Sequence, residues 1–401
     1  MHLQSDICII GNGAIGKVAA LGFAQTGHRV SLLSPEPGGR AGGQAAQAAN
    51  WDVRVYALNQ VAHDVLSSVR VWDALDASRI APVDAMLVKG DGGQDAGSLA
   101  FDAYGARVGA LAWIVEDANL NHALDAALRF APNVTSICGR ARTLRVDDGN
   151  ATVTLENGDT LAAPLLVGAD GAQSWVRGQC DIGIDYRPYH QCAIVTNFEC
   201  EKPHHGVAYQ WFTAAEGIIA LLPLPGQRVS LVWSAPDALA STLLNGSLDE
   251  LAQRLSVYAA EKLGTLRPIQ PEAVKSFPLS LLRPHAITAP RVALVGDAAH
   301  VVHPLAGHGM NLGFGDVAAL LKAVAEREPQ RDCGDARVLA RYARARKEEI
   351  LLMQLATDGL ERLFATEFEP LRVARNLGMN LLDRLPAIKR RLVAHALGRP
   401  S

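Results

Sequence analysis

The apolar positions at the start of the chain predict a strand, a helix and a second strand. Residues 6–10 are a short apolar run of the kind found in buried parallel strands, and residues 29–33 are another. Between them, residues 17–26 carry apolar positions at helical spacing, and Gly27 is a fitting helix stop. This pattern is typical of a βαβ unit in an α/β protein.

Two later apolar runs, 165–167 and 292–295, are also expected to be buried strands. The first follows a hairpin pattern in which residues 152–156 and 160–163 flank the turn Asn157-Gly158. Both runs end in a turn that contains Gly and Asp. Because ligands bind at the carboxyl ends of parallel strands, these two turns are candidate binding segments.

The middle of the chain has the pattern of a separate sheet. Residues 101–108 and 191–233 contain strand-like runs rich in Val, Ile, Trp and Tyr, and residues 248–263 have apolar positions at helical spacing. We therefore expect a mostly antiparallel sheet inserted between segments of the first domain. Three aromatic residues of this sheet either pack within it or form one wall of an aromatic pocket: Tyr209, Trp211 and Phe212.

The end of the chain is expected to be helical. Residues 369–382 and 388–397 have apolar faces, Pro386 separates them, and the last residues are basic. Packing against the first domain is one interpretation of these faces. Peripheral contact with a membrane or with a partner enzyme is the alternative.

Composition and charge argue against some classes of protein. The formal net charge is -3 and there is no long basic run, so a nucleic-acid partner has little support. No apolar stretch reaches about 18 residues, so no membrane span is expected. The six cysteines form no C-x-x-C pair. The first strand is expected to start near Asp6, which leaves no room for a targeting segment before it. We expect a cytoplasmic protein, with peripheral attachment to the inner membrane as the alternative.

The first turn, Gly11 to Gly16, has the pattern of a dinucleotide cradle. Gly11 permits a tight turn, Gly13 lets a pyrophosphate approach the backbone, and Gly16 lets the helix pack closely on the strand. The first N–H groups of the helix then face the phosphates. Ser34 stands where an acidic residue normally binds a ribose hydroxyl, and Glu36 is the other candidate for that contact.

The two later turns predict further contacts with the same ligand. Asp170 lies in a tight loop after its strand, and Asp297 can accept hydrogen bonds from sugar or ribityl hydroxyls. After Asp297, Pro304 and two glycines predict a loop whose backbone approaches something flat, and a long helix begins near Gly309. Its positive end would stabilise negative charge on a reduced flavin ring. The three segments together predict a bound flavin dinucleotide.

In their order and spacing, these segments resemble the class A flavoprotein aromatic hydroxylases, and most closely the UbiH-like ubiquinone-biosynthesis hydroxylases. Residues 52–59 are similar to the D-x-R-x-x-A-L-S signature of that family, and residues 303–313 contain its H-P-L-A-G-x-G-M-N-L-G motif. Residues 112–117 and 222–225 add to the resemblance. A Ser at position 34 and a His at position 308, in place of a common Gln, depart from the family pattern.

The resemblance implies an α/β fold with a Rossmann-like FAD-binding domain, an inserted substrate domain and a C-terminal helical tail. The FAD-binding domain would comprise residues 1–75, 105–180 and 280–330. The substrate domain would comprise residues 76–104 and 181–279, and the helical region residues 331–401.

The resemblance also implies chemistry. FAD would be bound without a covalent bond, NAD(P)H would reduce it and leave, and one oxygen atom of dioxygen would be transferred to the phenol ring of a polyprenylated ubiquinone precursor. Contacts to the cofactor are expected from Gly11, Gly13, Ala14, Gly16, Ser34, Arg54, Asp170, Asp297, Gly309, Met310 and Asn311. The candidates for a catalytic role are His303, Pro304 and His308.

Several alternatives stay open from the sequence. His300, His303 and His308 lack the i, i+4 spacing of zinc motifs, so no metal site is expected, and structural hydrogen bonds or a catalytic base are the other roles for these residues. The protein could act on another aromatic compound, or be a non-catalytic FAD-binding subunit of a quinone-biosynthesis complex. A nicotinamide dehydrogenase would use only the first motif, so the other two motifs argue against it.

Overall fold

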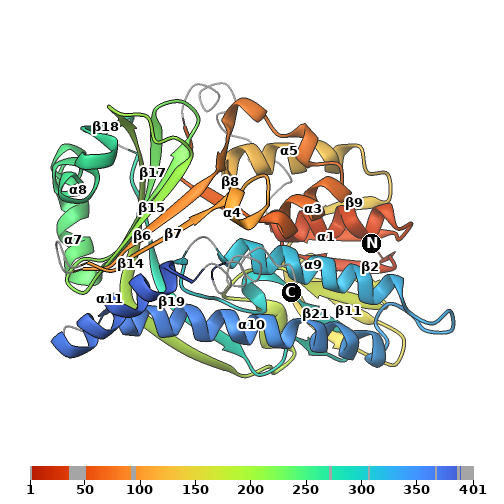
Figure 1. Ribbon diagram of the computed structural model, residues 1–401. Helices are drawn as coiled ribbons and strands as arrows, with labels where there is room; N and C mark the ends of the chain where they lie inside the picture. The colour runs from red at the N-terminus through yellow and green to blue at the C-terminus, as the bar shows by residue number, and fades with distance from the viewer. Residues whose placement is uncertain are drawn as a thin grey trace.

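The first layer of the protein is a six-stranded sheet with helices on one face. The computed structural model describes residues 2–35, 51–91, 96–270, 273–305, 308–365, 368–385 and 389 (Figure 1). The strands of this sheet are parallel except at β20, which is antiparallel to β21. In spatial order they are β20 (Thr288–Ala289), β21 (Val292–Leu294), β13 (Leu165–Gly168), β2 (Ile7–Ile10), β3 (Val30–Ser34) and β9 (Val134–Cys138).

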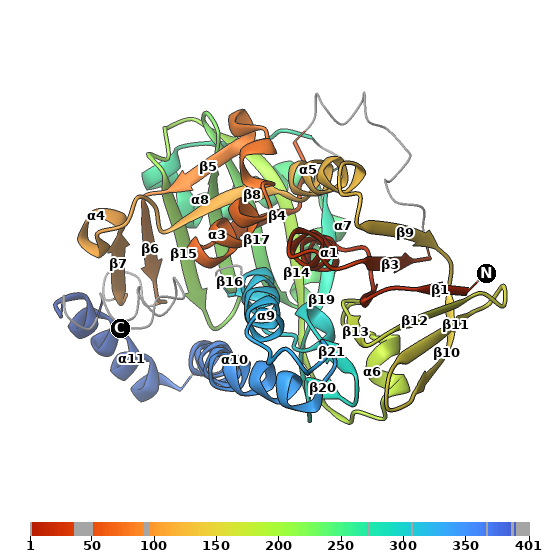
Figure 2. The same ribbon diagram turned by 90° about the vertical axis from the view of Figure 1, so that its right-hand side faces the viewer.

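The two faces of this sheet bury different partners (Figure 2). Ile7 and Ile9 point to one face and pack against helices, while Cys8 and Ile10 point to the other face. The helices on the first face are α1 (Ala14–Gln25), α3 (Gln60–Ser68), α5 (Asp117–Arg129), α9 (His308–Ala325) and α10 (Ala336–Ala365). The second face is covered by α6 (Trp175–Gln179) and by a small sheet of β1 (His2–Gln4), β10 (Ala141–Val146), β11 (Ala151–Leu155) and β12 (Thr160–Ala163).

The second layer is an eight-stranded sheet that is antiparallel except where β6 and β15 run parallel. Its outer face is covered by α7 (Asp237–Asn245) and α8 (Leu248–Leu263), so the predicted inserted sheet and the helix at 248–263 are confirmed. The strands are β6 (Ala85–Lys89), β7 (Ser98–Asp102), β14 (Ile184–Cys200), β15 (Val207–Thr213), β16 (Gly217–Leu224), β17 (Arg228–Pro236), β18 (Leu266–Pro268) and β19 (Lys275–Pro284).

One expected strand is shorter than the sequence pattern indicates. Residues 101–108 were expected to be strand-like, but β7 ends at Asp102 and the short helix α4 (Ala103–Ala106) follows. The physical reason is a cap: the Asp102 carboxylate accepts a hydrogen bond from the Gly105 N–H at 2.6 Å, which starts a helical turn.

A three-stranded sheet joins the two layers. It consists of β4 (Val55–Leu58), β8 (Ala112–Glu116) and β5 (Ile80–Val83), with β8 in the centre, and two single 3₁₀ turns (Trp72–Ala74 and Ala77–Arg79) precede β5. A cluster that includes Ala57, Ile114 and Leu224 packs this sheet against β16. The D-x-R signature therefore lies immediately before β4, between the two layers.

The carboxyl-terminal helices lie along both layers. The helix α11 (Glu369–Asp383) confirms the first predicted tail helix, whereas the second, at 388–397, falls outside the described residues apart from Lys389. In the described part of the chain no helix is long and apolar enough to cross a bilayer. The domain boundaries stay predictions. They are 1–75, 105–180 and 280–330 for the FAD-binding domain, 76–104 and 181–279 for the substrate domain, and 331–401 for the helical region.

A buried ion-pair network fixes α10 to the strand β21 and to α9. Asp316 of α9 accepts a hydrogen bond from Arg346 Nε at 2.7 Å and another from the Gly296 N–H at 2.9 Å. The Nε2 atom of His300 lies 2.6 Å from the same carboxylate. Burial alone would raise the pKa of Asp316, but the charges and hydrogen bonds of His300 and Arg346 outweigh that effect and lower it. The turn at Gly296 is therefore held by a carboxylate that stays ionised.

This network predicts the effect of Arg346→Met. The substitution leaves the Asp316 carboxylate buried without its guanidinium, so the free energy of unfolding should fall by about 3 kcal/mol. Because the folded-state pKa of Asp316 lies below 3.8, its contribution is present above that pH and is lost as the pH falls through the lower folded value. Urea midpoints at neutral pH measure the loss. Arg344→Met, at an exposed position of the same helix, is the control, and equal losses in both variants would contradict the prediction.

Candidate flavin and substrate site

Three turns that are far apart in the sequence meet at the carboxyl ends of β2, β13 and β21. A Cβ atom on Gly11, whose φ is +117°, would lie 2.1 Å from the carbonyl oxygen of Ala169. A Cβ atom on Gly313 would lie 2.9 Å from Ile15 Cδ1, and the Cβ position of Gly296 is 3.4 Å from the same side chain. The first turn therefore touches both later turns, as the flavin prediction requires.

The start of α1 has room for an anion. Gly13 is exposed, and among the residues that the structure describes no atom lies within 4 Å of its Cβ position and no side chain caps the helix there. Uncapped N–H groups at a helix N-terminus bind phosphate well. Gly16 instead serves packing, because its Cβ position is 2.0 Å from the Gly11 oxygen. These features fit the pyrophosphate of FAD at Gly11, Gly13 and Ala14.

Ser34 is buried at the end of β3, where its backbone oxygen accepts a hydrogen bond from the Gly139 N–H at 2.9 Å. Its position at the carboxyl end of the strand next to β2 agrees with the predicted contact to a ribose hydroxyl. Glu36, the other candidate for that contact, lies outside the described residues.

Asp170 and its neighbours form the second turn. The Asp170 carboxylate accepts hydrogen bonds from Ser174 Oγ at 2.5 Å and from the Val176 N–H at 3.0 Å, so it caps the start of α6. The buried Arg177 donates to the oxygens of Ala172 and Ala298 at 2.7 Å and 3.0 Å, which ties this turn to the third one. The side chain of Asp170 thus shapes the loop, and its predicted contact with the cofactor stays a prediction.

Arg54 and Asp297 are both accessible to solvent and close enough to affect each other. Enough protein surrounds the Asp297 carboxyl that burial raises its pKa, and the charges of His300 and Arg54 partly offset the rise. The Arg54 guanidinium lies 5.5 Å from the ring centre of Tyr56 and 5.6 Å from that of Phe277. The result is a fixed cation opposite a carboxylate that is able to accept hydrogen bonds from hydroxyl groups.

The segment that carries Arg54 is held by a buried ion pair. Glu116 accepts from Arg79 Nε at 2.6 Å and from the Asp52 N–H at 2.6 Å, and the Arg79 guanidinium also lies 4.4 Å from the ring centre of Trp51. Glu116 is wholly buried. The hydrogen bond from the Asp52 N–H to Glu116 thus links residues 52–59 to residues 112–117. Arg79, which holds Glu116, lies outside both segments, so no local sequence pattern points to it.

Asn311 joins the third segment to the same strand. Its side chain donates to the Ala57 oxygen at 2.8 Å and accepts from the Asn59 N–H at 3.0 Å, and both contacts are at the end of β4. Met310 is partly buried against the core between the parallel sheet and its helices, while no atom of the described residues lies within 4 Å of the Cβ position of Gly309. The open side of Gly309 fits a flat ring beside the start of α9. The side chain of His308 lies outside the described part, so its role stays a prediction.

His303, at the start of residues 303–313, is fully buried. Its Nε2 atom is 3.0 Å from Gln191 Oε1, and its ring meets that of Tyr189 edge to face at 5.0 Å. Burial lowers the pKa of His303 to about 4, so the imidazole is neutral near pH 7. Among the residues that the structure describes, no group of three His, Cys, Asp or Glu side chains could bind a metal ion. Structural hydrogen bonding is confirmed for His300 and His303, and the catalytic roles of His303 and Pro304 stay predictions.

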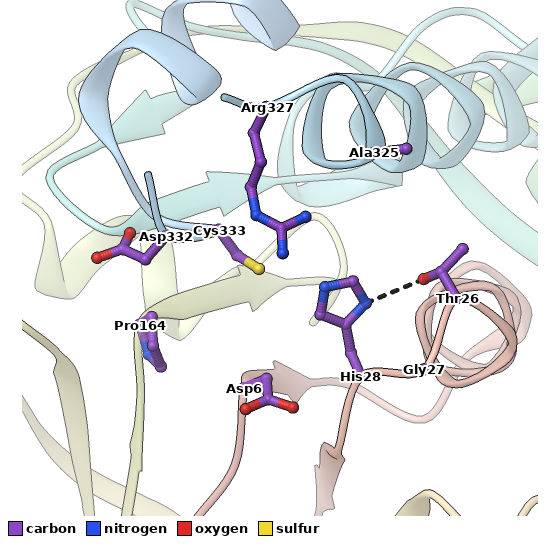
Figure 3. Close-up of a pocket in the computed structure, with 9 residues that line it drawn as sticks. All are labelled: Asp6, Thr26, Gly27, His28, Pro164, Ala325, Arg327, Asp332 and Cys333. Atoms are coloured by element: carbon purple, nitrogen blue, oxygen red, sulfur yellow. Dashed lines mark hydrogen bonds between the residues drawn. The ribbon is translucent and has the colours of Figure 1, made fainter. Parts of the chain in front are cut away.

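A separate depression of about 630 Å³ lies at the other end of the strands (Figure 3). Its lining includes Asp6, His28 and Pro164, which precede β2, β3 and β13, together with Arg327 and Cys333. Since ligands of α/β sheets bind at the carboxyl ends of strands, this depression is not the cofactor site.

Comparison with known proteins agrees with the geometry. A family model described as an FAD binding domain matches residues 4–350. The chain is 35% identical over 398 residues to the ubiquinone hydroxylase UbiL of Rhodospirillum rubrum, covering 98% of this chain and 90% of that protein. It is 33% identical to the 3-demethoxyubiquinol 3-hydroxylase of Escherichia coli, covering 98% of each chain.

Solved structures show the same fold at low sequence identity. The p-nitrophenol 4-monooxygenase PnpA of Pseudomonas putida superposes with a TM-score of 0.78 at 17% identity, covering 100% of this chain and 99% of that one. Klebsiella pneumoniae HpxO, solved with FAD and uric acid, has a TM-score of 0.73 at 18% identity and covers 98% and 97% of the two chains. On its sequence relatives and its fold, the chain belongs to the FAD-binding flavoprotein family, in the group of UbiH-like hydroxylases among the class A FAD-dependent aromatic monooxygenases.

Proposed function

We propose that the protein hydroxylates the aromatic ring of a ubiquinone precursor, a polyprenyl phenol, using FAD, NAD(P)H and dioxygen. The observation that carries the proposal is the meeting of three distant turns, in which Gly11 contacts Ala169 and Ile15 contacts Gly296. The names of the sequence relatives, a ubiquinone hydroxylase and a demethoxyubiquinol hydroxylase, support the substrate class.

Each part of the site has a distinct task in this reaction. Bound FAD, once reduced by NAD(P)H, would activate dioxygen, of which one oxygen atom goes to the ring and the other leaves as water. The start of α1 would bind the pyrophosphate, the Ser34 hydroxyl could exchange a hydrogen bond with a ribose hydroxyl, and Asp297 would accept hydrogen bonds from ribityl hydroxyls. The start of α9 favours negative charge on the ring that lies beside Gly309, and Arg54 provides a fixed positive charge.

An apolar cluster next to this site suits a polyprenyl chain. Phe212, Leu305 and Phe364 are buried together, with Met379 of α11 packed against them. Tyr209 and Trp211 point to the opposite face of β15 and pack under α8, so their role is sheet packing. Phe212 is therefore the aromatic residue that we assign to the substrate side.

A pair of glycine substitutions tests the cofactor site. Gly13→Val places its side chain in open space, so the apoprotein should keep its Tm, but FAD should bind at least tenfold more weakly, about 1.4 kcal/mol, because the pyrophosphate can no longer approach. Gly11→Ala meets the Ala169 oxygen and a positive φ, so it should lower stability by about 2 kcal/mol. Thermal unfolding and flavin fluorescence titration measure the two effects. Normal FAD affinity in Gly13→Val would contradict the assignment.

The function itself predicts three observations. The purified protein should be yellow and release flavin on heating, NADH or NADPH should bleach it faster when a phenolic substrate is present, and a strain that lacks the protein should accumulate one quinone precursor. Mass spectrometry of quinone intermediates identifies that precursor. A yellow protein that never oxidises NAD(P)H would instead indicate a non-catalytic subunit, and a normal quinone profile would indicate another aromatic substrate.

We further propose that α11 rests on a membrane surface. Three polar residues of this helix face the protein: Arg375 pairs with Asp91, Asn380 accepts from the Ser98 N–H at 2.9 Å, and Asp383 accepts from the Ala100 N–H at 3.0 Å. The apolar residues face outward, with Leu377 63% and Leu381 61% exposed. A helix that presents its leucines to solvent is suited to the boundary between lipid headgroups and acyl chains.

The double substitution Leu377→Ser and Leu381→Ser tests this surface. It should reduce co-sedimentation with vesicles that contain anionic lipid by tenfold or more, since about 2 kcal/mol of apolar burial is lost. Val257→Ser, at an 82% exposed position of α8, is the matched control and should bind like the wild type. Wild-type protein that stays in the supernatant would overturn the proposal, and retention of a quinone-biosynthesis enzyme instead would identify a partner protein as the occupant.

A further inference from the structure

An irregularity in β14 brings two buried side chains to His303. The pairing of β14 with β19 runs to Pro188 and resumes at Cys192, with three residues of β14 opposite Leu279 alone. In the centre of this bulge, His190 has a φ of +55°, a left-handed conformation that costs free energy for a non-glycine residue. Bulges of this kind redirect side chains next to functional sites. Here they direct Tyr189 and Gln191, both buried, against His303.

The orientation of the Gln191 amide follows from its second neighbour. Its Nε2 atom lies 3.0 Å from Glu361 Oε1, and a carboxylate oxygen only accepts hydrogen bonds, so the amide N–H points to Glu361. The amide oxygen then faces His303, where it also only accepts. His303 must therefore donate its Nε2–H, and the neutral ring carries no proton on Nδ1.

The other ring nitrogen is left as an acceptor. Nδ1 of His303 is buried and has no hydrogen-bond partner among the described residues. A buried acceptor without a donor is costly, so such an atom is usually matched by water or by a ligand. The ring lies in the segment that leads into α9, beside the predicted flavin contacts.

We propose that Gln191, held by Glu361, is a positioning residue that keeps His303 in its Nε2–H tautomer and leaves Nδ1 to accept a hydrogen bond from water or from a hydroxyl group. The inference rests on the proposed function only for its effect on turnover. The tautomer itself depends on contacts within the chain.

Nitrogen-15 spectra of the histidine rings in the FAD-bound protein test the tautomer. In the wild type, His303 should show a protonated Nε2 and an unprotonated Nδ1 from pH 8 down to about pH 5, in line with its pKa of about 4. Gln191→Leu removes the acceptor and should give a mixture of tautomers. Gln253→Leu, at an exposed position of α8, is the matched control and should leave the His303 signals unchanged.

The conservative variant Gln191→Glu keeps the proposal testable if Gln191→Leu does not fold. A carboxyl group at position 191 lies beside Glu361, so the two would share a proton, and its other oxygen still accepts from the His303 Nε2–H. The Nε2–H tautomer should therefore be kept. A wild-type ring protonated on Nδ1, or an unchanged tautomer in folded Gln191→Leu, would overturn the proposal. Loss of the Nε2–H tautomer in Gln191→Glu would overturn it as well.

Turnover separates this inference from the proposed function. In Gln191→Leu, kcat for hydroxylation should fall about tenfold, while FAD affinity and the KM for NAD(P)H stay within twofold. Gln191→Glu should shift the pH profile of kcat. If the wild type shows the predicted tautomer but hydroxylates no phenol, the proposed function fails and the positioning role stands.

Discussion

The contact between the backbones of Gly11 and Ala169 is the constraint on which the site depends. No side chain fits between these two turns, because even a Cβ atom on Gly11 would lie 2.1 Å from a carbonyl oxygen. The parallel register of β2 and β13 brings the turns to the same height, and the chain has to meet there without side chains. Ile15 then fills the space beside Gly296 and Gly313. A cofactor that contacts all three turns can be bound only because they are packed this closely.

Electrostatic interactions orient the turns that this packing brings together. Asp316 is buried, yet it stays ionised because Arg346 and His300 contact it, and it fixes the Gly296 N–H that begins the third turn. Asp297, one residue later, faces solvent and the positive charge of Arg54. The Asp316 carboxylate thus stabilises the fold, whereas the Asp297 carboxylate is available to a ligand. A buried pair seldom adds much stability, so its value here is in orientation.

The fold and the three turns that meet at the strand ends were largely predictable from local patterns, and the contacts that hold these turns were not. Short apolar runs, glycine turns and helical spacing depend on neighbouring residues, which is why 6–10, 165–167 and 248–263 were recognised. Gln191 and His303 are separated by 112 positions, and Arg79 and Glu116 by 37, with no periodicity that links them. The length of β7 was misjudged because one capping carboxylate, Asp102, outweighed an apolar run. Tertiary partners of this kind follow only from the packed sheets.

The long helix α10 connects all parts of the active region. Arg346 in its first half holds the flavin turn, Glu361 near its end orients Gln191, and Phe364 packs in the apolar cluster next to Leu305. Arg346 and Glu361 are fifteen positions apart, about 22 Å along a rigid helix. Contact of α11 with lipid would act directly on the end of α10, because Arg375 donates to the oxygens of Leu363 and Phe364. A polyprenyl chain that enters beside α11 would therefore meet the same element that sets the geometry at the flavin.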